Sequence, residues 1–120
     1  MPLDLRSLGF WLKGLFGAPA TSGDAGTGFT HAFTSGGSLP SLAIEIGHPT
    51  LATPKFFRHS GAKLGSLAFD MARSGPANAT IAVIAQGESE SAATIDAAPA
   101  SLGLRRFSQG SGSILVGGEP

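Results

Sequence analysis

The chain has 120 residues, which is room for one domain, and its eight Lys and Arg residues are balanced by eight Asp and Glu residues. No basic stripe is available to neutralise a run of phosphates, which argues against a sequence-reading nucleic-acid binder. The absence of Cys excludes disulfides, thiolate chemistry and zinc sites built on Cys. The 18 Gly and 8 Pro residues favour turns and short strands over a helical bundle.

The first predicted element is a short helix at residues Leu5–Phe16. Asp4 is a good N-cap, because its carboxylate can accept from the free amides of the first turn, and Gly17 suits the position after the helix. Gly9 and Gly14 each weaken the helix by about 1 kcal/mol relative to Ala, so packing must hold it in place. The apolar stripe available for that packing consists of Leu5, Leu8, Leu12, Leu15 and Phe16.

The segment after the helix predicts a loop followed by two strands. Thr21–Gly28 is Gly-rich and is expected to be a loop. In Phe29–Thr34 bulky and small side chains alternate, which predicts a half-buried strand with Phe29, His31 and Phe33 on one face. Leu42–Ile46 alternates in the same way and predicts a second strand. Gly47–Lys55 contains two prolines and is expected to be a loop.

The clearest element is a predicted hairpin at about Lys63–Gln86. Its two strands alternate apolar and small side chains on either side of a turn that contains Gly75 and Pro76. Matching the apolar faces with Gly75 at the centre sets the register. The expected pairs are Phe69 with Ile81 and Leu67 with Val83.

The remaining sequence is less patterned. Glu88–Gly103 is expected to be a loop with a frayed strand near Thr94–Asp96, and Arg105–Val116 is expected to form a last strand. The longest apolar run, Ala77–Ala85, falls well short of the roughly 20 residues that span a bilayer, so no membrane segment is expected. Taken together, residues 1–120 predict one mainly β domain with a short N-terminal helix.

Motifs that could carry chemistry are weak in this chain. Ser60 and Lys63 have the S-x-x-K spacing of penicillin-binding enzymes, but the S-D-N and K-T-G motifs that complete such a site do not occur. A turn leading into the hairpin is the favoured interpretation of this segment. His31, His48 and His59 lack metal-ligand spacing and would have to converge from separate elements.

Three further patterns have a structural explanation and do not require a functional site. Gly23, Gly26 and Gly28 do not have phosphate-loop spacing and precede a strand, whereas phosphate loops open helices. The glycosylation sequon Asn78–Thr80 falls inside a predicted strand, and the acidic residues Glu88 and Glu90 suit a solvated loop. We therefore expect no catalytic, cofactor-binding or metal residues, no cofactor and no enzyme activity.

Five segments follow one another in a recognisable order: Pro2-Leu3-Asp4, Leu8–Gly17 with Ala18-Pro19, Thr30–Phe33, Leu39–Glu45 and Ser60–Leu67. This ordered set resembles the central part of the tail tube (major tail) proteins of long-tailed bacteriophages and their prophage relatives. The resemblance covers about Pro2–Glu88, and the order of the segments is more specific than any one of them.

This resemblance implies an antiparallel β-sandwich or barrel-like tail tube fold. It implies subunits that self-assemble into rings, usually hexameric, which stack into a tube whose lumen passes DNA non-specifically. The implied partners are copies of the chain and other tail proteins such as the tape measure. The implied location is the virion tail, assembled in the bacterial host cytoplasm. Similar family members are usually longer, so the chain is expected to be an incomplete, central fragment with unpaired strand edges.

A lumen strand should present polar, non-sticky side chains to DNA. This favours the face that carries Ser66, Ala68 and Asp70. The alternative function is a small β-sandwich binding module of a virion or bacterial surface, which predicts a closed monomer with a concave, aromatic-lined patch. An enzyme ranks third, because no nucleophile, base and orienting group can be assembled from the sequence.

Overall fold

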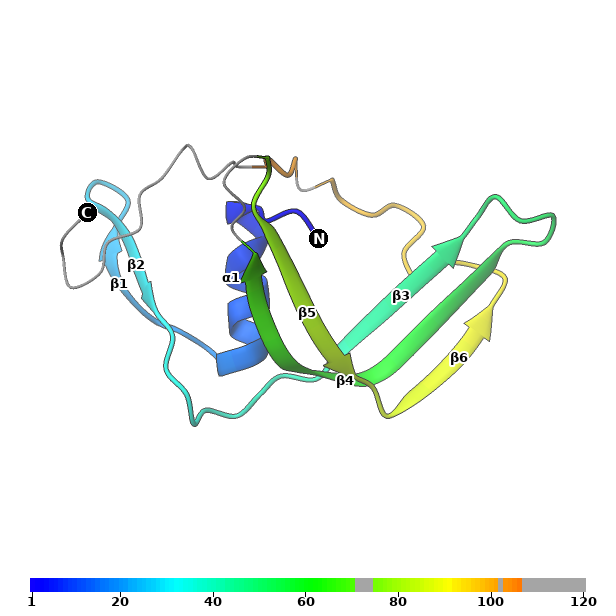
Figure 1. Ribbon diagram of the computed structural model, residues 1–120, viewed down its shortest axis with the longest axis horizontal. Coiled ribbons are helices and arrows are strands. Elements are labelled where there is room, and N and C mark those ends of the chain that lie inside the picture. The colour runs from blue at the N-terminus through cyan, green and yellow to red at the C-terminus, as the bar shows by residue number, and fades with distance from the viewer. Residues whose placement is uncertain (71–74, 102, 107–120) are drawn as a thin grey trace.

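The computed structural model describes residues 1–70, 75–101 and 103–106, and contains one helix followed by strands (Figure 1). The helix α1 spans Leu5–Phe16, the range expected from the sequence. The strands are β1 (Ala20–Asp24), β2 (Gly28–Ala32), β3 (Leu42–His48), β4 (Lys55–Asp70), β5 (Asn78–Ile84) and β6 (Gly87–Ser91). The expected fold class, mainly antiparallel β with one short N-terminal helix, is confirmed.

The long strand β4 organises the molecule. Its first half lies between β3 and β6, and its second half pairs with β5, with every pairing antiparallel. The change of partner occurs around Gly61, which has a φ of 63°, and next to a register shift between Leu64 and Ser66. A glycine adopts this left-handed conformation without the cost that a side chain adds. The two halves of β4 therefore point in different directions and form two arms (Figure 1).

The helix is fixed at both ends by the residues expected to do so. Asp4 Oδ1 accepts from the amides of Arg6 and Ser7 at 2.8 and 3.0 Å. Gly17, with a φ of 95°, donates its amide to the Lys13 carbonyl at 2.9 Å. Leu5 departs from the expected stripe, because it is 71% exposed.

The small core forms where the N-terminal segment meets β5. The Leu3 amide donates to the Ala77 carbonyl at 2.8 Å, and the Ala79 amide donates to the Met1 carbonyl at 2.7 Å. Residues 1–3 thus extend the hairpin sheet beyond β5 in the manner of a third strand. Leu3, Ala77 and Ala79 are buried there, with Leu8 and Leu67 packed against them.

A second contact joins α1 to β4 through a glycine. A Cβ at Gly14 would overlap Leu64 Cδ1, and Leu64 itself is buried. Gly14 therefore permits the close approach of helix and strand that buries Leu64, together with the neighbouring Ala62. Helix propensity alone predicts only the cost of Gly14 to the helix and not this packing role.

The expected hairpin register is wrong by two residues. Phe69 pairs with Ala79, and Ile81 pairs with Leu67. A shift of two keeps each residue on its predicted face, so Phe69 and Ile81 still share one side of the sheet. The observed register places Ala79 where it pairs with β4 on one side and with Met1 on the other. Matching the apolar faces of the two hairpin strands takes no account of the pairing between Ala79 and Met1.

Three expected loops or turns contain strand instead. The Thr21–Gly28 segment includes most of β1, the Ser60–Lys63 turn lies inside β4, and Glu88–Gly103 begins with most of β6. Each gains strand structure by pairing with a neighbour, and small or polar residues such as those of β6 give little periodicity by which to predict it. The expected frayed strand at Thr94–Asp96 is irregular in the structure.

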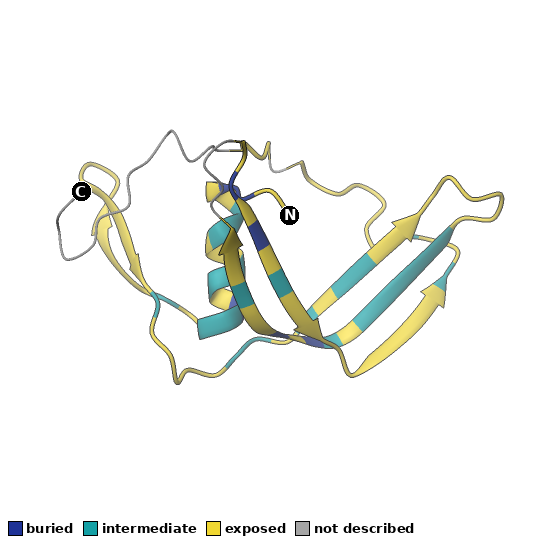
Figure 2. Cartoon of the chain, viewed as in Figure 1, coloured by how far each residue is buried: buried dark blue, intermediate teal, exposed yellow. Residues whose placement is uncertain are grey.

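Two further expectations concern exposure and the C-terminal region. The strand predicted near Phe29 as half-buried is exposed along all of β2 (Figure 2). Of the expected last strand Arg105–Val116, only Arg105 and Arg106 are described, and Arg106 forms an isolated bridge with Asp4. Residues 107–116 lie outside the described residues.

Candidate assembly surface

The chain exposes a large surface for its mass. Its accessible area is 8704 Å², whereas a closed monomer of 12.0 kDa exposes about 6,000 Å². Buried side chains cluster where α1 contacts β4 and β5. The β1–β2 hairpin, β3, β6 and the first part of β4 (residues 55–60) are exposed or half-buried (Figure 2). Much apolar surface is therefore available to a partner.

A continuous apolar groove runs from the N-terminal end of α1 to β3. It consists of three hollows of about 740, 380 and 350 Å³. Met1 and Trp11 line both the first and the second hollow, and Ile44 and Val83 line both the second and the third. We call these three hollows the apolar groove. Its apolar lining includes Met1, Phe10, Trp11, Ile44, Ile46, Ile81 and Val83.

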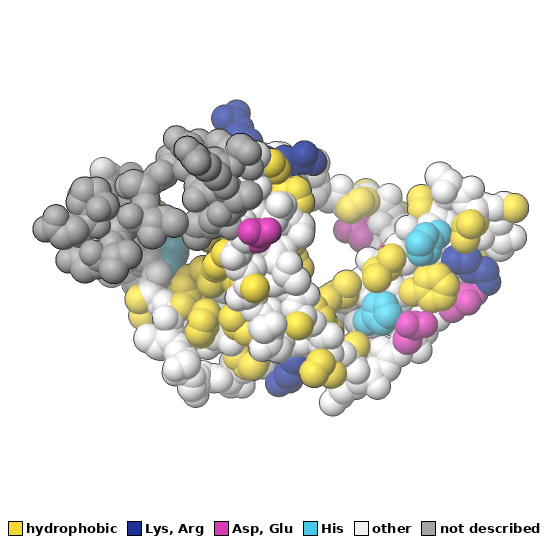
Figure 3. Space-filling view, viewed as in Figure 1, with side chains coloured by type: hydrophobic (Ala, Val, Ile, Leu, Met, Phe, Trp, Pro, Cys, Tyr) yellow, Lys and Arg dark blue, Asp and Glu magenta, His cyan; other side chains and the backbone are white. Residues whose placement is uncertain are grey.

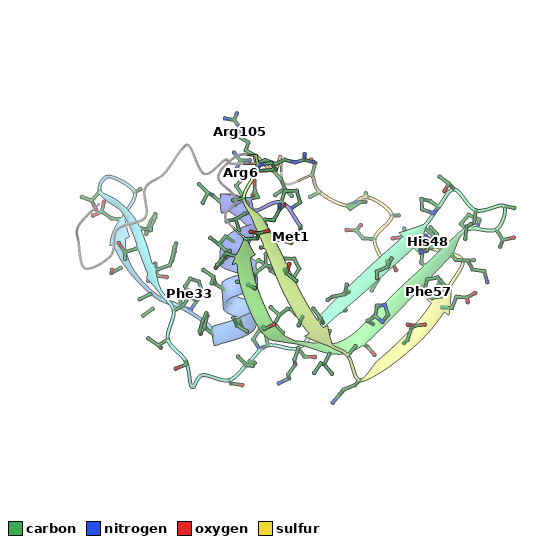
Figure 4. The ribbon with its side chains drawn as sticks, in the orientation of Figure 1. Met1, Arg6, Phe33, His48, Phe57 and Arg105 are labelled. Atoms are coloured by element: carbon green, nitrogen blue, oxygen red, sulfur yellow. The ribbon has the colours of Figure 1, made fainter. Side chains whose placement is uncertain are left out.

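The widest end of the groove is aromatic and bordered by positive charge. The Phe10 and Trp11 rings meet edge to face, with centroids 5.2 Å apart, and Phe10 is 56% exposed. Arg6 and Arg106 line the same hollow. Figure 3 shows Lys and Arg side chains gathered at this end of the molecule, and Figure 4 places Arg6 and Arg105 at the same end.

Among the described residues that line this hollow, Asp4 is the only acidic one, and its carboxylate is already hydrogen-bonded within the chain. Asp4 is 3% exposed, its Oδ1 caps α1, and its Oδ2 accepts the Arg105 amide. The described rim is therefore positive on balance, and an apolar partner with an accessible carboxylate fits it better than a cationic one.

Ion pairs, in place of a buried core, connect the strands of the other arm. Arg58 Nε lies 2.9 Å from Glu45 Oε2, joining β4 to β3. Lys55 pairs with Glu90, and His59 Nδ1 lies 3.4 Å from Glu88 Oε2, so both join β4 to β6. Exposed pairs of this kind contribute little to stability individually.

Glu45 makes the most contacts of these carboxylates. It accepts from Thr94 Oγ1 at 2.6 Å and from the Ile95 amide at 3.0 Å, in addition to Arg58. The Thr94 hydroxyl and then the Arg58 guanidinium lower the pKa of Glu45 below its ordinary value, because both stabilise the ionised carboxylate. Glu45 therefore connects β3 to the segment that follows β6.

Strand edges are open on this surface. Within the described residues β3 and β6 each pair with β4 alone, so each leaves one edge without a partner strand. On β5, the N-terminal segment pairs only near Asn78 and Ala79, and Ile84 at the other end is 75% exposed. Such edges can hydrogen-bond a strand from another chain.

One face of the β4–β5 hairpin is polar and exposed. Ser66 pairs with Ala82, Ala68 with Thr80 and Asp70 with Asn78, and all six residues are exposed. The opposite face carries Leu67 and Ala79 and packs toward the core. The face proposed for the lumen from the sequence is thus a continuous strip of small or polar side chains.

The residues considered for chemistry lie apart. His31 Nδ1 is 2.8 Å from Thr21 Oγ1 on the β1–β2 hairpin, His48 lies edge-on to Phe57, and His59 contacts Glu88. No three His, Asp or Glu side chains of the described residues cluster as metal ligands. None of the described helices is long and apolar enough to cross a membrane.

The remaining candidates have structural surroundings. Ser60 Oγ donates to the Gly87 carbonyl at 3.5 Å, whereas Lys63 Nζ donates to the Leu39 carbonyl at 3.3 Å. In the β1–β2 hairpin, Gly23 pairs with Phe29 and Gly28 pairs with Asp24. The sequon Asn78–Thr80 lies in β5. The groove itself was missed, because its lining comes from segments far apart in the sequence.

The fold and surface define a β-rich structural protein with open edges and an exposed apolar groove. The family model for phage tail tube proteins matches residues 1–120. The chain belongs to the phage tail tube protein family, and its role is that of a structural component of the tail. No curated protein and no solved structure matches the chain.

Proposed function

We propose that the chain assembles with copies of itself into rings, hexameric as is usual in such tubes, which stack into a tube for DNA passage. The observation that carries this proposal is the apolar groove together with the open edges of β3, β5 and β6. Neighbouring copies would cover the groove and pair the edges. Family membership supports the same arrangement.

The proposal extends to partners and location. The tube is assembled in the host cytoplasm as part of the virion tail, and its partners include other tail proteins such as the tape measure. Residues 1–120 act as one tail-tube domain, without catalytic, cofactor or metal residues of their own. DNA contact is non-specific, as expected for a chain with no basic stripe.

Electron microscopy of the purified full chain tests the assembly. Rings or stacked tubes with a central channel are the expected result, and the mass per ring gives the subunit number. A stable monomer across a wide concentration range would overturn the proposal. That result would favour the alternative, a small β-sandwich binding module.

The polar face of the β4–β5 hairpin supports the lumen assignment. Asp70 is the only charged side chain among the six residues of this strip, so a ring would carry a circle of negative charge at this strip that DNA does not adhere to. Replacing Asp70 by Lys should make assembled tubes retain double-stranded DNA at low salt, measured by co-sedimentation. Asp96→Lys is the matched control outside this face. Equal DNA retention by the two variants would remove the assignment.

A further inference from the structure

The β1–β2 hairpin stands apart from the rest of the described chain. Every residue of both strands is exposed, and the hairpin lies on the side of α1 away from β3 and β6 (Figures 1 and 2). Phe33, at its base, is half-buried (Figure 4). A two-stranded hairpin is marginally stable alone in water, so packing against another surface would stabilise it.

The tip of the hairpin presents one large apolar side chain. Phe29 is 59% exposed and lies opposite Gly23, so no side chain on β1 covers its ring. Burying an aromatic ring of this kind contributes substantially to an interface. The hairpin therefore carries an anchor that its own chain leaves in solvent.

The same tip carries a negative charge. Asp24 Oδ1 accepts from the amides of Gly26 and Thr27 at 2.7 and 2.9 Å, which holds the turn. The Thr27 amide and then the Gly26 amide lower the pKa of Asp24, because they stabilise its carboxylate. Asp24 is the only Asp, Glu, Lys or Arg in residues 20–32, so the hairpin is anionic at neutral pH.

We propose that the β1–β2 hairpin of one copy docks in the apolar groove of the next copy. Phe29 enters the aromatic hollow beside Phe10 and Trp11, and Asp24 faces the Arg6 and Arg106 rim. This pairing matches an apolar anchor with an apolar hollow and a negative tip with a positive rim. It rests on the proposed self-assembly and specifies one contact within it.

The occupant is a second copy for a geometric reason. In its own chain, α1 and the β4–β5 hairpin lie between the β1–β2 hairpin and β3 (Figure 1). Hairpin and groove are different surfaces, so the contact is heterologous and repeats from copy to copy, which closes rings or extends filaments. The acidic strand β6 is a poorer occupant, because Glu88 and Glu90 are already paired and its sequence has no apolar anchor.

Cross-linking between single-Cys variants tests the contact, since the natural chain has no Cys. Thr30→Cys marks β2 and leaves Phe29 intact, and Ser7→Cys marks the aromatic hollow of the groove and leaves Phe10 and Trp11 intact. The two variants, distinguished by a mass tag, are mixed and treated with a short bismaleimide. Thr30→Cys mixed with Thr53→Cys is the control, because Thr53 lies on the exposed β3–β4 loop.

We expect at least tenfold more mixed dimer with Ser7→Cys than with Thr53→Cys. Adding Phe29→Ala should remove most of that excess. Asp24→Asn, which keeps a turn-holding oxygen but removes the charge, should lower it about threefold, as for a surface ion pair. Asp96→Asn, at another exposed Asx turn, should leave it unchanged.

The outcomes separate the two proposals. Rings or tubes without excess mixed dimer would overturn the docking and leave the proposed function standing. Excess mixed dimer without rings or tubes would support the docking and remove the proposed function. Preferential cross-linking of Ser7→Cys to Ser89→Cys would place β6 in the groove and would also overturn the docking.

Discussion

The two arms of the molecule are held together by different forces. Where α1 packs on β4 and β5, the chain buries Leu3, Leu64 and Ala79. In the β3–β4–β6 arm, no residue of β3, of β6 or of the first part of β4 (residues 55–60) is buried. Cross-strand ion pairs connect these strands instead. The first arm resembles the core of a small domain, and the second resembles half of an interface. In the proposed assembly, the second arm would rely on neighbouring copies for its stability.

The largest expected effect is the removal of a side chain at the joint between helix and strand. Leu64→Ala should destabilise the chain by about 2–5 kcal/mol, because Leu64 is buried against α1. Ile46→Ala, in the other arm and 50% exposed, should cost the unassembled chain less than about 1 kcal/mol. Urea denaturation at one fixed protein concentration measures both. Equal losses would break the distinction between the arms.

A pair of helix glycines gives the next effect, with opposite signs. Gly9→Ala should stabilise by about 1 kcal/mol, because no atom lies within 4 Å of the added Cβ. Gly14→Ala gains the same propensity, but the overlap with buried Leu64 costs about 1–3 kcal/mol. The same denaturation experiment should rank Gly14→Ala below Gly9→Ala. Stabilisation of similar size by both would show that α1 does not pack tightly on β4.

The helix cap should have a smaller effect of its own. Asp4→Ala removes the acceptor for the Arg6 and Ser7 amides and should cost about 1–2 kcal/mol. Asp4→Asn retains a capping oxygen but loses the acceptor for the Arg105 amide, so it should lose less than Asp4→Ala. Melting temperatures of the two variants measure the difference. If Asn and Ala were equally harmful, the charge of Asp4 or its bond to the Arg105 amide, and not its capping bonds, would be the important property.

The smallest expected effect is a pH dependence of the ion-paired arm. Because folding lowers the pKa of Glu45 from its ordinary value of 4.5, the carboxylate stabilises the folded state above pH 4.5. That contribution is lost as pH falls through the lower, folded pKa. The difference in stability between the natural chain and Glu45→Gln should therefore shrink on acidification from pH 6 to pH 3. A constant difference would contradict the assignment.

Local patterns predicted the elements that local forces determine. The cap at Asp4, the end at Gly17 and the faces of the hairpin strands all depend on near neighbours in the sequence. The register of β5 and the existence of β6 did not follow, because they depend on pairing with Met1 and with residues 56–60. Long-range pairing leaves little trace in a single stretch of sequence.

The candidate site was predicted only in part. The resemblance implied unpaired strand edges, and β3 and β6 each have one within the described residues, but the apolar groove was not predicted. Phe10 and Trp11 belong to the helix, Ile44 to β3 and Val83 to β5, and only the fold brings them together. The exposure of Phe29, in a strand predicted to be half-buried, is the clearest departure from the sequence prediction.

Hydrogen exchange of the assembled and dissociated chain tests most directly whether neighbouring copies complete the open arm. We expect assembly to slow amide exchange in β3, β6 and the β1–β2 hairpin, with little change in α1, whose amides are already bonded within the helix. Unchanged exchange at all three open elements in assembled rings would contradict the account.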